Sequence, residues 1–285
     1  MTKFMHSEIR QPETPRKPRL DHELRVAMDL ALRAGHLLME KYCPQLEVRY
    51  KNNNEIVTAA DIESNELICH GLLATFSADA ICSEECVNTD VASPARRVWI
   101  VDPLDSTSNY VRGGNEYSLS IGLAIEGEAA LGVVYNPSRQ ELFSGYVGYG
   151  ASRNGIPVRA SLAAPPHRPR LLVSSKEWKR GVSTTAGYQI TPMSSMAYKL
   201  ARVSAGYEDG VLSFKNRKPW GTCAGTALVL SAGGQVTSLD GQSLVFDCKG
   251  PRTFGGLVAS GARMHSSVLE LAAVLKACMP ARFSA

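Results

Sequence analysis

Apolar side chains recur at steps of three and four residues near the start of the chain. Over residues 21–42 this spacing predicts an amphipathic helix with Asp21 as its N-cap, and a second helix is predicted from about 61 to 73. Residues 49–60 between them are polar, which favours a loop with a short strand. Residues 1–20 are polar and carry three prolines, so we expect a loose tail there.

Short apolar runs bounded by turn residues follow these helices. Residues 80–82 form one brief run, and residues 98–101 are apolar throughout, which is typical of a strand buried on both faces. Residues 117–126, 130–136 and 141–147 predict a meander of three further strands, because Glu-Gly and Asn-Pro pairs separate them.

A stretch rich in proline and alanine, residues 163–170, is the predicted boundary between two halves, 21–162 and 163–285. The second half alternates between predicted strands (171–173, 210–214, 235–238, 257–260) and predicted helices (194–203, 222–232, 266–278). This alternation predicts an α/β fold with helices and sheets in layers.

The composition is that of an ordinary globular protein. The 285 residues are 44% hydrophobic and 20% charged, which suits one large domain or two tightly joined ones. The net charge is only +4, and part of it lies among the prolines of the tail. We therefore expect no nucleic-acid polymer as a partner.

Cysteine usage and the lengths of the apolar runs bear on the cellular compartment. The seven cysteines include Cys82 and Cys86 close together, but no second pair lies at metal-ligand spacing, so we expect free thiols and no zinc site. The longest apolar runs fall far short of the roughly 20 residues that a membrane span needs. We expect a cytoplasmic protein with no membrane partner.

Two aspartates follow the apolar run 98–101. Asp102 and Asp105 are three residues apart, and a Ser-Thr-Ser sequence begins at Ser106. Carboxylates at a strand end suit Mg²⁺, and backbone N–H groups at a helix start suit phosphate oxygens. On its own, this spacing is more typical of a simple turn with a helix N-cap.

Two further acidic features strengthen the metal interpretation. Glu84 and Glu85 follow the run 80–82, and Asp61 lies at the start of the second predicted helix. Three acidic clusters at strand ends or helix starts together predict metal-assisted hydrolysis of a phosphate ester. In that chemistry cations offset developing charge and acidify a water, while a hydroxyl beside a carboxylate orients it.

Ordered motifs along the chain resemble those of the inositol monophosphatase superfamily, which includes inositol monophosphatases, bisphosphate nucleotidases and fructose-1,6-bisphosphatases. The resemblance covers nearly the whole chain after the tail, and several motifs in one order are far more specific than any single one. The matching segments are Thr58–Asp61, Glu84–Glu85, Asp102–Thr107, Gly132–Pro137, Gly148–Gly155 and Trp220–Gly225.

The resemblance implies a layered αβαβα sandwich, a homodimer and two or three Mg²⁺ ions. Carried over residue by residue, it makes Glu84, Asp102, Asp105 and the backbone carbonyl of Leu104 the metal ligands. It also implies a small phosphorylated metabolite as the partner.

The resemblance also assigns the groups around the attacking water. Thr107, with Asp61 behind it and Glu84 nearby, would activate the water, and the N–H groups of Ser106 and Thr107 would hold the phosphate. Lys199, on the predicted helix 194–203, is a candidate contact for a distal anion of the substrate. A solvated helix face is its alternative.

Two residues depart from the family's motifs. Ser106 stands where the family has glycine, so it needs either a negative φ or tolerated strain. Gly221 stands where the family has an aspartate that helps to hold the second metal. Cys223 and Asp209 are conceivable substitutes for that carboxylate. Its loss implies weaker metal binding, a changed substrate or lost activity.

The sequence therefore supports three functions. The first is a phosphatase acting on a sugar phosphate or an inositol phosphate. The second is a nucleotidase of the same fold acting on 3′-phosphoadenosine 5′-phosphate. The third is a non-catalytic relative that binds phosphate ligands, and Gly221 is its support.

Overall fold

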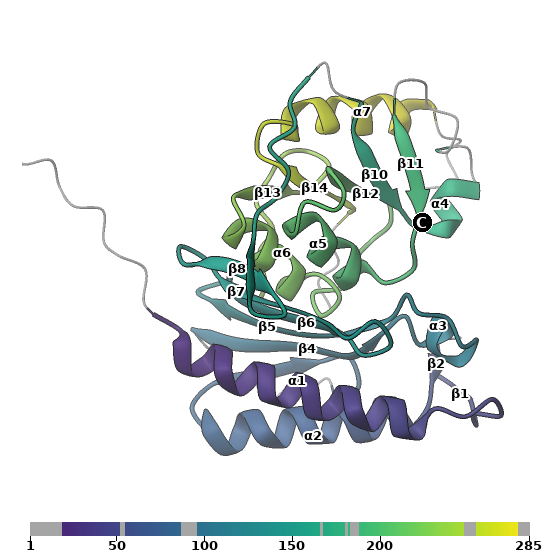
Figure 1. Cartoon of the computed structure of the whole chain (residues 1–285), viewed down its shortest axis with the longest axis vertical. Coiled ribbons are helices and arrows are strands. Elements are labelled where there is room, and N and C mark those ends of the chain that lie inside the picture. Colours follow the sequence, from purple (N-terminus) through teal and green to yellow (C-terminus); the bar gives the residue numbers. More distant parts are fainter. Residues whose placement is uncertain are drawn as a thin grey trace, which may run out of the picture.

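Helices and sheets alternate in five layers along the long axis of the molecule (Figure 1). The computed structural model describes residues 19–51, 55–86, 96–165, 168–179, 182, 188–247 and 255–278. The expected tail over residues 1–20 lies almost wholly outside them. No helix in the described residues is long and apolar enough to cross a membrane.

The outer layer of the first half consists of α1 (Asp21–Lys41) and α2 (Ala59–Thr75). The buried face of α1 carries alanines and leucines at helical spacing, which confirms the predicted amphipathic pattern. The prediction that Asp21 is the N-cap was wrong, because Leu20 holds that position. Asp21 lies in the first turn, where its carboxylate accepts hydrogen bonds from Arg19 (2.7 Å) and from the Tyr146 hydroxyl (2.8 Å).

The second layer is a seven-stranded sheet whose spatial order follows the chain. Only the β3–β4 pairing is parallel, and every other neighbouring pair is antiparallel. Its strands are β3 (Ala80–Ser83), β4 (Arg97–Asp105), β5 (Ser118–Ile125), β6 (Glu128–Asn136), β7 (Glu141–Tyr146), β8 (Gly150–Arg153) and β9 (Ile156–Val158). The predicted meander is confirmed. The hairpin β8–β9 was not predicted, because its strands are short and rich in small and polar residues.

The buried strand predicted over 98–101 is the middle of β4. Trp99 and Val101 pack into the core beneath α1 and α2, whereas Val98 and Ile100 pack into the core on the opposite face. Both faces of β4 are therefore covered, which explains why the segment is apolar without alternation.

The second half adds a mixed five-stranded sheet and the helices on both of its faces. Its strands, in spatial order, are β11 (Gln189–Pro192), β10 (Arg170–Val173), β12 (Gly210–Ser213), β14 (Leu257–Gly261) and β13 (Gly234–Thr237). Helices α5 (Met196–Ser204) and α6 (Cys223–Ser231) lie between the two sheets, and α7 (His265–Cys278) covers the outer face (Figure 1). The short helix α4 (Ser175–Lys179) follows β10. Neither α4 nor β11 was predicted.

One hydrophobic core joins the two sheets through α5 and α6. It contains Ile100 and Val134 from the large sheet, Leu200 and Leu228 from the helices, and Leu257 from the smaller sheet. The division into halves near residue 163 stays a prediction, since both halves contribute to the same core.

Two glycines let α6 approach the large sheet closely. A Cβ on Gly122 would lie 2.8 Å from the Ala224 backbone nitrogen, and a Cβ on Gly132 would overlap the Ala224 carbonyl oxygen. Only a residue without a side chain fits against the helix backbone at these positions. This close packing fixes the start of α6 and the preceding residues beside the end of β4.

We expect Gly132→Ala to lower the free energy of unfolding by about 3 kcal/mol, because the added methyl group meets backbone that cannot rotate away. Chemical denaturation measures this. Gly255→Ala is the matched control, because its Cβ meets no atom of the described residues within 4 Å. Equal stability of the two variants would contradict the close packing of α6.

Candidate active site

A break in the register of β4 turns two carboxylates toward the same side. Asp102 pairs with Ser120 of β5, and Asp105 pairs with Ser118. Between these two pairs, β4 therefore contains one residue more than β5. In a regular strand, side chains three residues apart point to opposite faces. The irregularity instead places both aspartates on the face toward α5 and α6.

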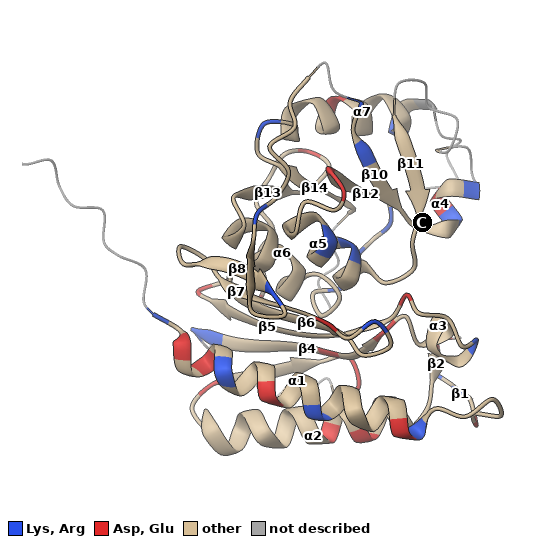
Figure 2. Cartoon of the chain, in the orientation of Figure 1, with Lys and Arg blue, Asp and Glu red and all other residues tan. Residues whose placement is uncertain are grey.

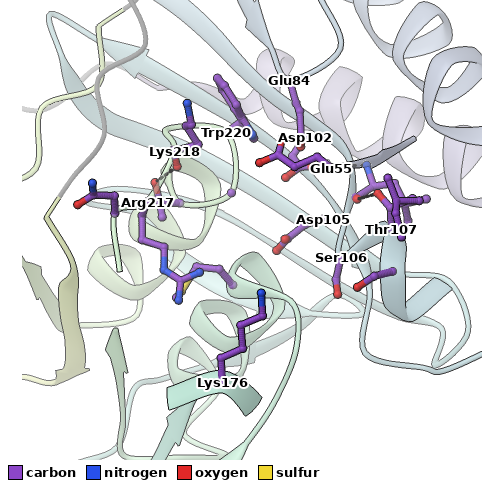
Figure 3. A pocket seen from close by; sticks show the side chains of 17 residues that line it. Glu55, Glu84, Asp102, Asp105, Ser106, Thr107, Lys176, Arg217, Lys218 and Trp220 are labelled. Carbon is purple, nitrogen blue, oxygen red and sulfur yellow. Dashed lines mark hydrogen bonds between the residues drawn. The ribbon is translucent and has the colours of Figure 1, made fainter. Parts of the chain in front are cut away.

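Glu84 comes from the neighbouring strand. Its backbone N–H donates to the Val101 carbonyl of β4 (3.1 Å), which continues the parallel pairing of β3 and β4 into the loop. Glu84, Asp102, Asp105, Ser106 and Thr107 line one cavity of about 450 Å³ (Figure 3). The structure thus brings together the residues that the resemblance named.

The carboxylates of this cavity destabilise one another when they are charged. Burial raises the pKa of Asp102 well above its usual value, and the charges of Glu84 and Asp105 raise it further. Burial also raises the pKa of Glu84 to about 7, although the Lys51 ammonium opposes the shift. Burial raises the pKa of Asp105 as well. A cation in the cavity would relieve this repulsion.

The hydrogen bonds around these carboxylates occupy only part of their oxygens. Asp105 Oδ2 accepts from the Ser195 hydroxyl (2.6 Å) and from the Ala197 N–H (2.7 Å), and Asp102 Oδ1 accepts from the Leu104 N–H (3.1 Å). Within the described ranges, no three acidic, histidine or cysteine side chains already converge as a metal site. The donors are nevertheless the hard oxygens that Mg²⁺ prefers, so the residues present fit this ion chemically.

Lys51 lies against the acidic loop after β3. Its ammonium is 2.6 Å from a Glu85 oxygen and 3.4 Å from a Glu84 oxygen. The lysine directly follows β1 (Arg49–Tyr50) and precedes β2 (Ile56–Val57) in the chain, and its side chain reaches the acidic loop. Lys51 neutralises part of the acidic cluster, and no lysine or arginine among the described residues forms an ion pair with Asp102 or Asp105.

Thr107 and Asp61 form the pair expected to orient a water. The Thr107 hydroxyl is 2.9 Å from Asp61 Oδ1 and 3.2 Å from the Leu104 carbonyl oxygen, so two acceptors compete for its hydrogen. The other Asp61 oxygen accepts from the Thr58 N–H (2.8 Å) and hydroxyl (2.7 Å) at the start of α2. Burial raises the pKa of Asp61, which makes its carboxylate a stronger proton acceptor.

Ser106 adopts the backbone conformation that favours glycine. Its φ is +80° and its ψ is 51°, at the N-cap of α3 (Thr107–Val111). A left-handed conformation costs a side chain-bearing residue about 1–2 kcal/mol. Of the two conditions set out from the sequence, a negative φ or tolerated strain, the structure shows the second.

Gly221 lies directly beside the acidic cluster. A Cβ at this position would be 3.7 Å from Asp102 Oδ2, so an aspartate here would share a cation with Asp102. Neither conceivable substitute lines the cavity. Cys223 is buried next to Gly122, and the carboxylate of Asp209 accepts hydrogen bonds from Ser161 (2.5 Å) and from the Arg170 N–H (2.8 Å).

Lys199 neither lines the cavity nor faces solvent. Both expectations for it, a contact with a substrate anion and a place on a solvated helix face, were therefore wrong. Its side chain is fully buried, and its ammonium donates to the Met193 carbonyl (3.2 Å). Burial and the nearby Arg217 charge lower its pKa to about 7. A direct contact with a substrate anion therefore has no support at this residue.

Three cations that were not predicted line the cavity instead, namely Lys176, Arg217 and Lys218. Lys176 belongs to α4, and the other two precede Trp220. The only signal in the sequence is the basic run 215–218 directly before the Trp220 motif. Its position opposite the carboxylates depends on how the second half folds back, which spacing does not show.

Comparisons with known proteins agree with this arrangement. The model of the inositol monophosphatase family matches residues 19–275. A histidinol-phosphatase of Chlorobaculum parvum is 32% identical over 227 residues, which cover 79% of this chain and 79% of that protein. The Nus factor SuhB of Escherichia coli is 31% identical over 232 residues, which cover 76% of this chain and 85% of that protein.

Solved structures share the fold. An IMPase of Thermotoga maritima matches 91% of this chain and 100% of its own with a TM-score of 0.77 and 27% identity. The chain has the layered α/β sandwich of these phosphatases, and it belongs to the inositol monophosphatase family. The predicted fold class and the family resemblance are both confirmed.

We expect Ser106→Gly to raise the free energy of unfolding by about 1 kcal/mol, because glycine adopts a φ of +80° without strain. Thermal and chemical denaturation measure the change. Ser106→Ala is the control, since alanine keeps the Cβ and its strain while it loses the hydroxyl. A gain of the same size in the alanine variant would assign the effect to the hydroxyl and contradict the explanation.

Proposed function

We propose that the protein is a Mg²⁺-dependent phosphatase that hydrolyses a phosphate monoester of a small polyhydroxylated metabolite, a sugar phosphate or an inositol phosphate. The observation that carries the proposal is one shared cavity. The cavity is lined by the carboxylates Glu84, Asp102 and Asp105 and by Thr107. The Thr107 hydroxyl donates a hydrogen bond to Asp61. The family is typically Mg²⁺-dependent, and the oxygen donors fit that ion.

Glu84, Asp102, Asp105 and the Leu104 carbonyl are the groups that would hold Mg²⁺. When bound, the ions would offset negative charge on the phosphate and make a water more acidic. The carboxylates would in turn lose the mutual repulsion that now raises the pKa of Asp102.

Thr107 and Asp61 would accept the proton of the attacking water. The Thr107 oxygen would accept a hydrogen bond from the water while its own hydrogen is donated to Asp61 Oδ1, at 2.9 Å. As the water oxygen bonds to phosphorus, its proton passes to Thr107 and the threonine hydrogen passes to Asp61. The ester P–O bond would break, and the leaving oxygen would depart as an alkoxide that takes a proton from solvent to become the alcohol. Ser106 and Thr107 line the cavity, and their backbone N–H groups would hold the phosphate oxygens.

Two other functions remain as alternatives. A 3′-phosphoadenosine 5′-phosphate nucleotidase would use the same carboxylates, and Trp220 in the cavity wall could contact a base. A non-catalytic ligand-binding role is supported by Gly221 and by the similarity to a relative named as a Nus factor. A cytoplasmic location, expected from the cysteines and the short apolar runs, stays a prediction. A homodimer, implied by the resemblance, also stays a prediction, and size-exclusion chromatography tests it.

We expect Asp102→Asn to lower Mg²⁺-dependent phosphate release by at least about a thousandfold, because it removes a buried carboxylate beside two others. The assay measures inorganic phosphate released from inositol 1-phosphate, sugar 1-phosphates, fructose 1,6-bisphosphate and 3′-phosphoadenosine 5′-phosphate, with Mg²⁺ and with EDTA.

Asp240→Asn is the matched control for this assay, because Asp240 is an exposed carboxylate outside the cavity lining. We expect it to retain the activity of the unsubstituted chain. Unchanged phosphate release by the Asp102→Asn variant would refute the proposed mechanism. If the unsubstituted, folded chain releases no phosphate from any of these substrates, the result would favour the non-catalytic function.

We expect Gly221→Asp to lower the apparent Mg²⁺ dissociation constant about tenfold, because it adds a carboxylate beside Asp102 Oδ2. In EDTA the same variant should melt at a lower temperature, since the new charge repels Asp102. Gly221→Asn, of the same shape without the charge, is the control. If asparagine and aspartate at this position bind Mg²⁺ equally, residue 221 does not border the ion.

A further inference from the structure

The wall of the cavity opposite Thr107 is basic. Lys176 projects from α4 toward the cavity that the carboxylates line. Arg217 and Lys218, from the segment between β12 and α6, also line this cavity, and the Lys218 side chain is turned toward Trp220 (Figure 3). The basic residues of α4 are also evident in Figure 2. The proposed mechanism uses none of these three cations.

One donor of Arg217 has no hydrogen-bond partner in the described part of the chain. Its Nε donates to the Ser213 hydroxyl (2.6 Å), but its Nη2 is buried without a hydrogen-bond partner among the described residues. The Nη2 atom lies 3.8 Å from a Glu177 oxygen, which is too long for a hydrogen bond. A buried donor of a charged group that lacks a partner is costly, so it points to a missing acceptor.

Glu177 holds Arg217 in place without completing its hydrogen bonds. The carboxylate is fully buried and accepts from the Ser174 N–H (2.9 Å) and the Phe214 N–H (2.7 Å). Its oxygens are therefore engaged with the backbone at the start of α4 and the end of β12. Glu177 ties together the two segments that carry the cations and keeps the Arg217 guanidinium at the cavity.

The ammonium groups of Lys176 and Lys218 are also free to bind an anion. In the part of the chain that the structure describes, neither Lys176 nor Lys218 makes an ion pair, and the Lys218 ammonium lies 5.4 Å from the centre of the Trp220 ring. Charges of one sign along the wall of a cleft attract ligands of the opposite sign. Three cations with spare donors can bind a dianionic group by charge-assisted hydrogen bonds.

We propose that Lys176, Arg217 and Lys218 form a subsite for a second phosphate group of the substrate, which makes the substrate class a small metabolite that carries two phosphates. The inference rests on the proposed phosphatase function and adds the substrate class. One phosphate lies at Thr107 and the carboxylates, and the other lies at the basic wall. A cavity of about 450 Å³ is large enough for a sugar bisphosphate.

Matched substrate pairs test the subsite. We compare glucose 1,6-bisphosphate with glucose 1-phosphate, and 3′-phosphoadenosine 5′-phosphate with adenosine 3′-phosphate, under saturating Mg²⁺. We expect kcat/KM to be at least tenfold higher for the bisphosphate of one pair, mainly through a lower KM. The pair that shows the preference tells whether a sugar or a nucleoside carries the two phosphates.

Variants then assign the preference to the basic wall. We expect the double variant Lys176→Met, Lys218→Met to lower the ratio of bisphosphate to monophosphate kcat/KM about tenfold, through KM. Lys179→Met is the matched control, because Lys179 is an exposed lysine of the same helix outside the cavity lining. We expect it to keep the ratio.

Arg217→Gln should lower the same ratio, but it leaves the buried Glu177 without a countercharge and can unfold the chain. For that reason the test depends on the two lysines, and the melting temperature of each variant is measured alongside. No preference for either bisphosphate, or a preference that the lysine variants keep, would overturn the subsite. If the unsubstituted, folded chain releases no phosphate from any of these substrates in the presence of Mg²⁺, the phosphatase function itself is overturned.

Discussion

Burying Asp102 next to Glu84 and Asp105 is the constraint that the rest of the cavity has to accommodate. Two like charges about 5 Å apart repel by roughly 3 kcal/mol at an effective dielectric constant near 20, and burial adds a desolvation cost for each. The described residues offset part of this through Lys51 at Glu84 and through hydrogen bonds to the two aspartates. The remaining repulsion is what a divalent cation would remove.

The same constraint joins the layers of the molecule. Asp105 extends from β4 of the large sheet and accepts hydrogen bonds from Ser195 and Ala197 at the start of α5. The Ser195 hydroxyl also contacts Ser118 of β5 (3.0 Å), directly opposite Asp105 in the sheet. A carboxylate near a helix start is stabilised by the helix dipole. The charge that one half buries is therefore partly balanced by the other, so the site and the packing of the layers depend on each other.

Much of this could be predicted from the sequence, because the signals are local. The apolar run of β4 indicates burial on both faces, and polar residues at helix starts mark α2 and its capping aspartate Asp61. Acidic residues directly after β3 and at the C-terminal end of β4 meet at one edge of the sheet, because these strands are parallel neighbours.

The features that could not be predicted depend on tertiary structure. The register break of β4 has no signature in the spacing of Asp102 and Asp105, yet it decides that both point to one cavity. The Asp21 prediction failed because a carboxylate in the first turn and one at the N-cap look alike in sequence. Lys199 occurs on a predicted helix, but only the docking of α5 between the sheets shows that it is buried.

Gly221 and the basic wall change the charge of the cavity in the same direction. The glycine removes one negative charge beside Asp102, and Lys176, Arg217 and Lys218 add positive charge across from it. A sugar that carries a single phosphate, held at the carboxylates and Thr107, would gain little from either change, whereas a substrate with more negative charge would gain from both. Phosphate oxygens are themselves ligands for Mg²⁺, so such a substrate can supply a ligand that the missing carboxylate no longer provides. On this view the altered residue is part of a site adapted to a more anionic substrate, and the loss of a metal ligand at residue 221 is compatible with catalysis.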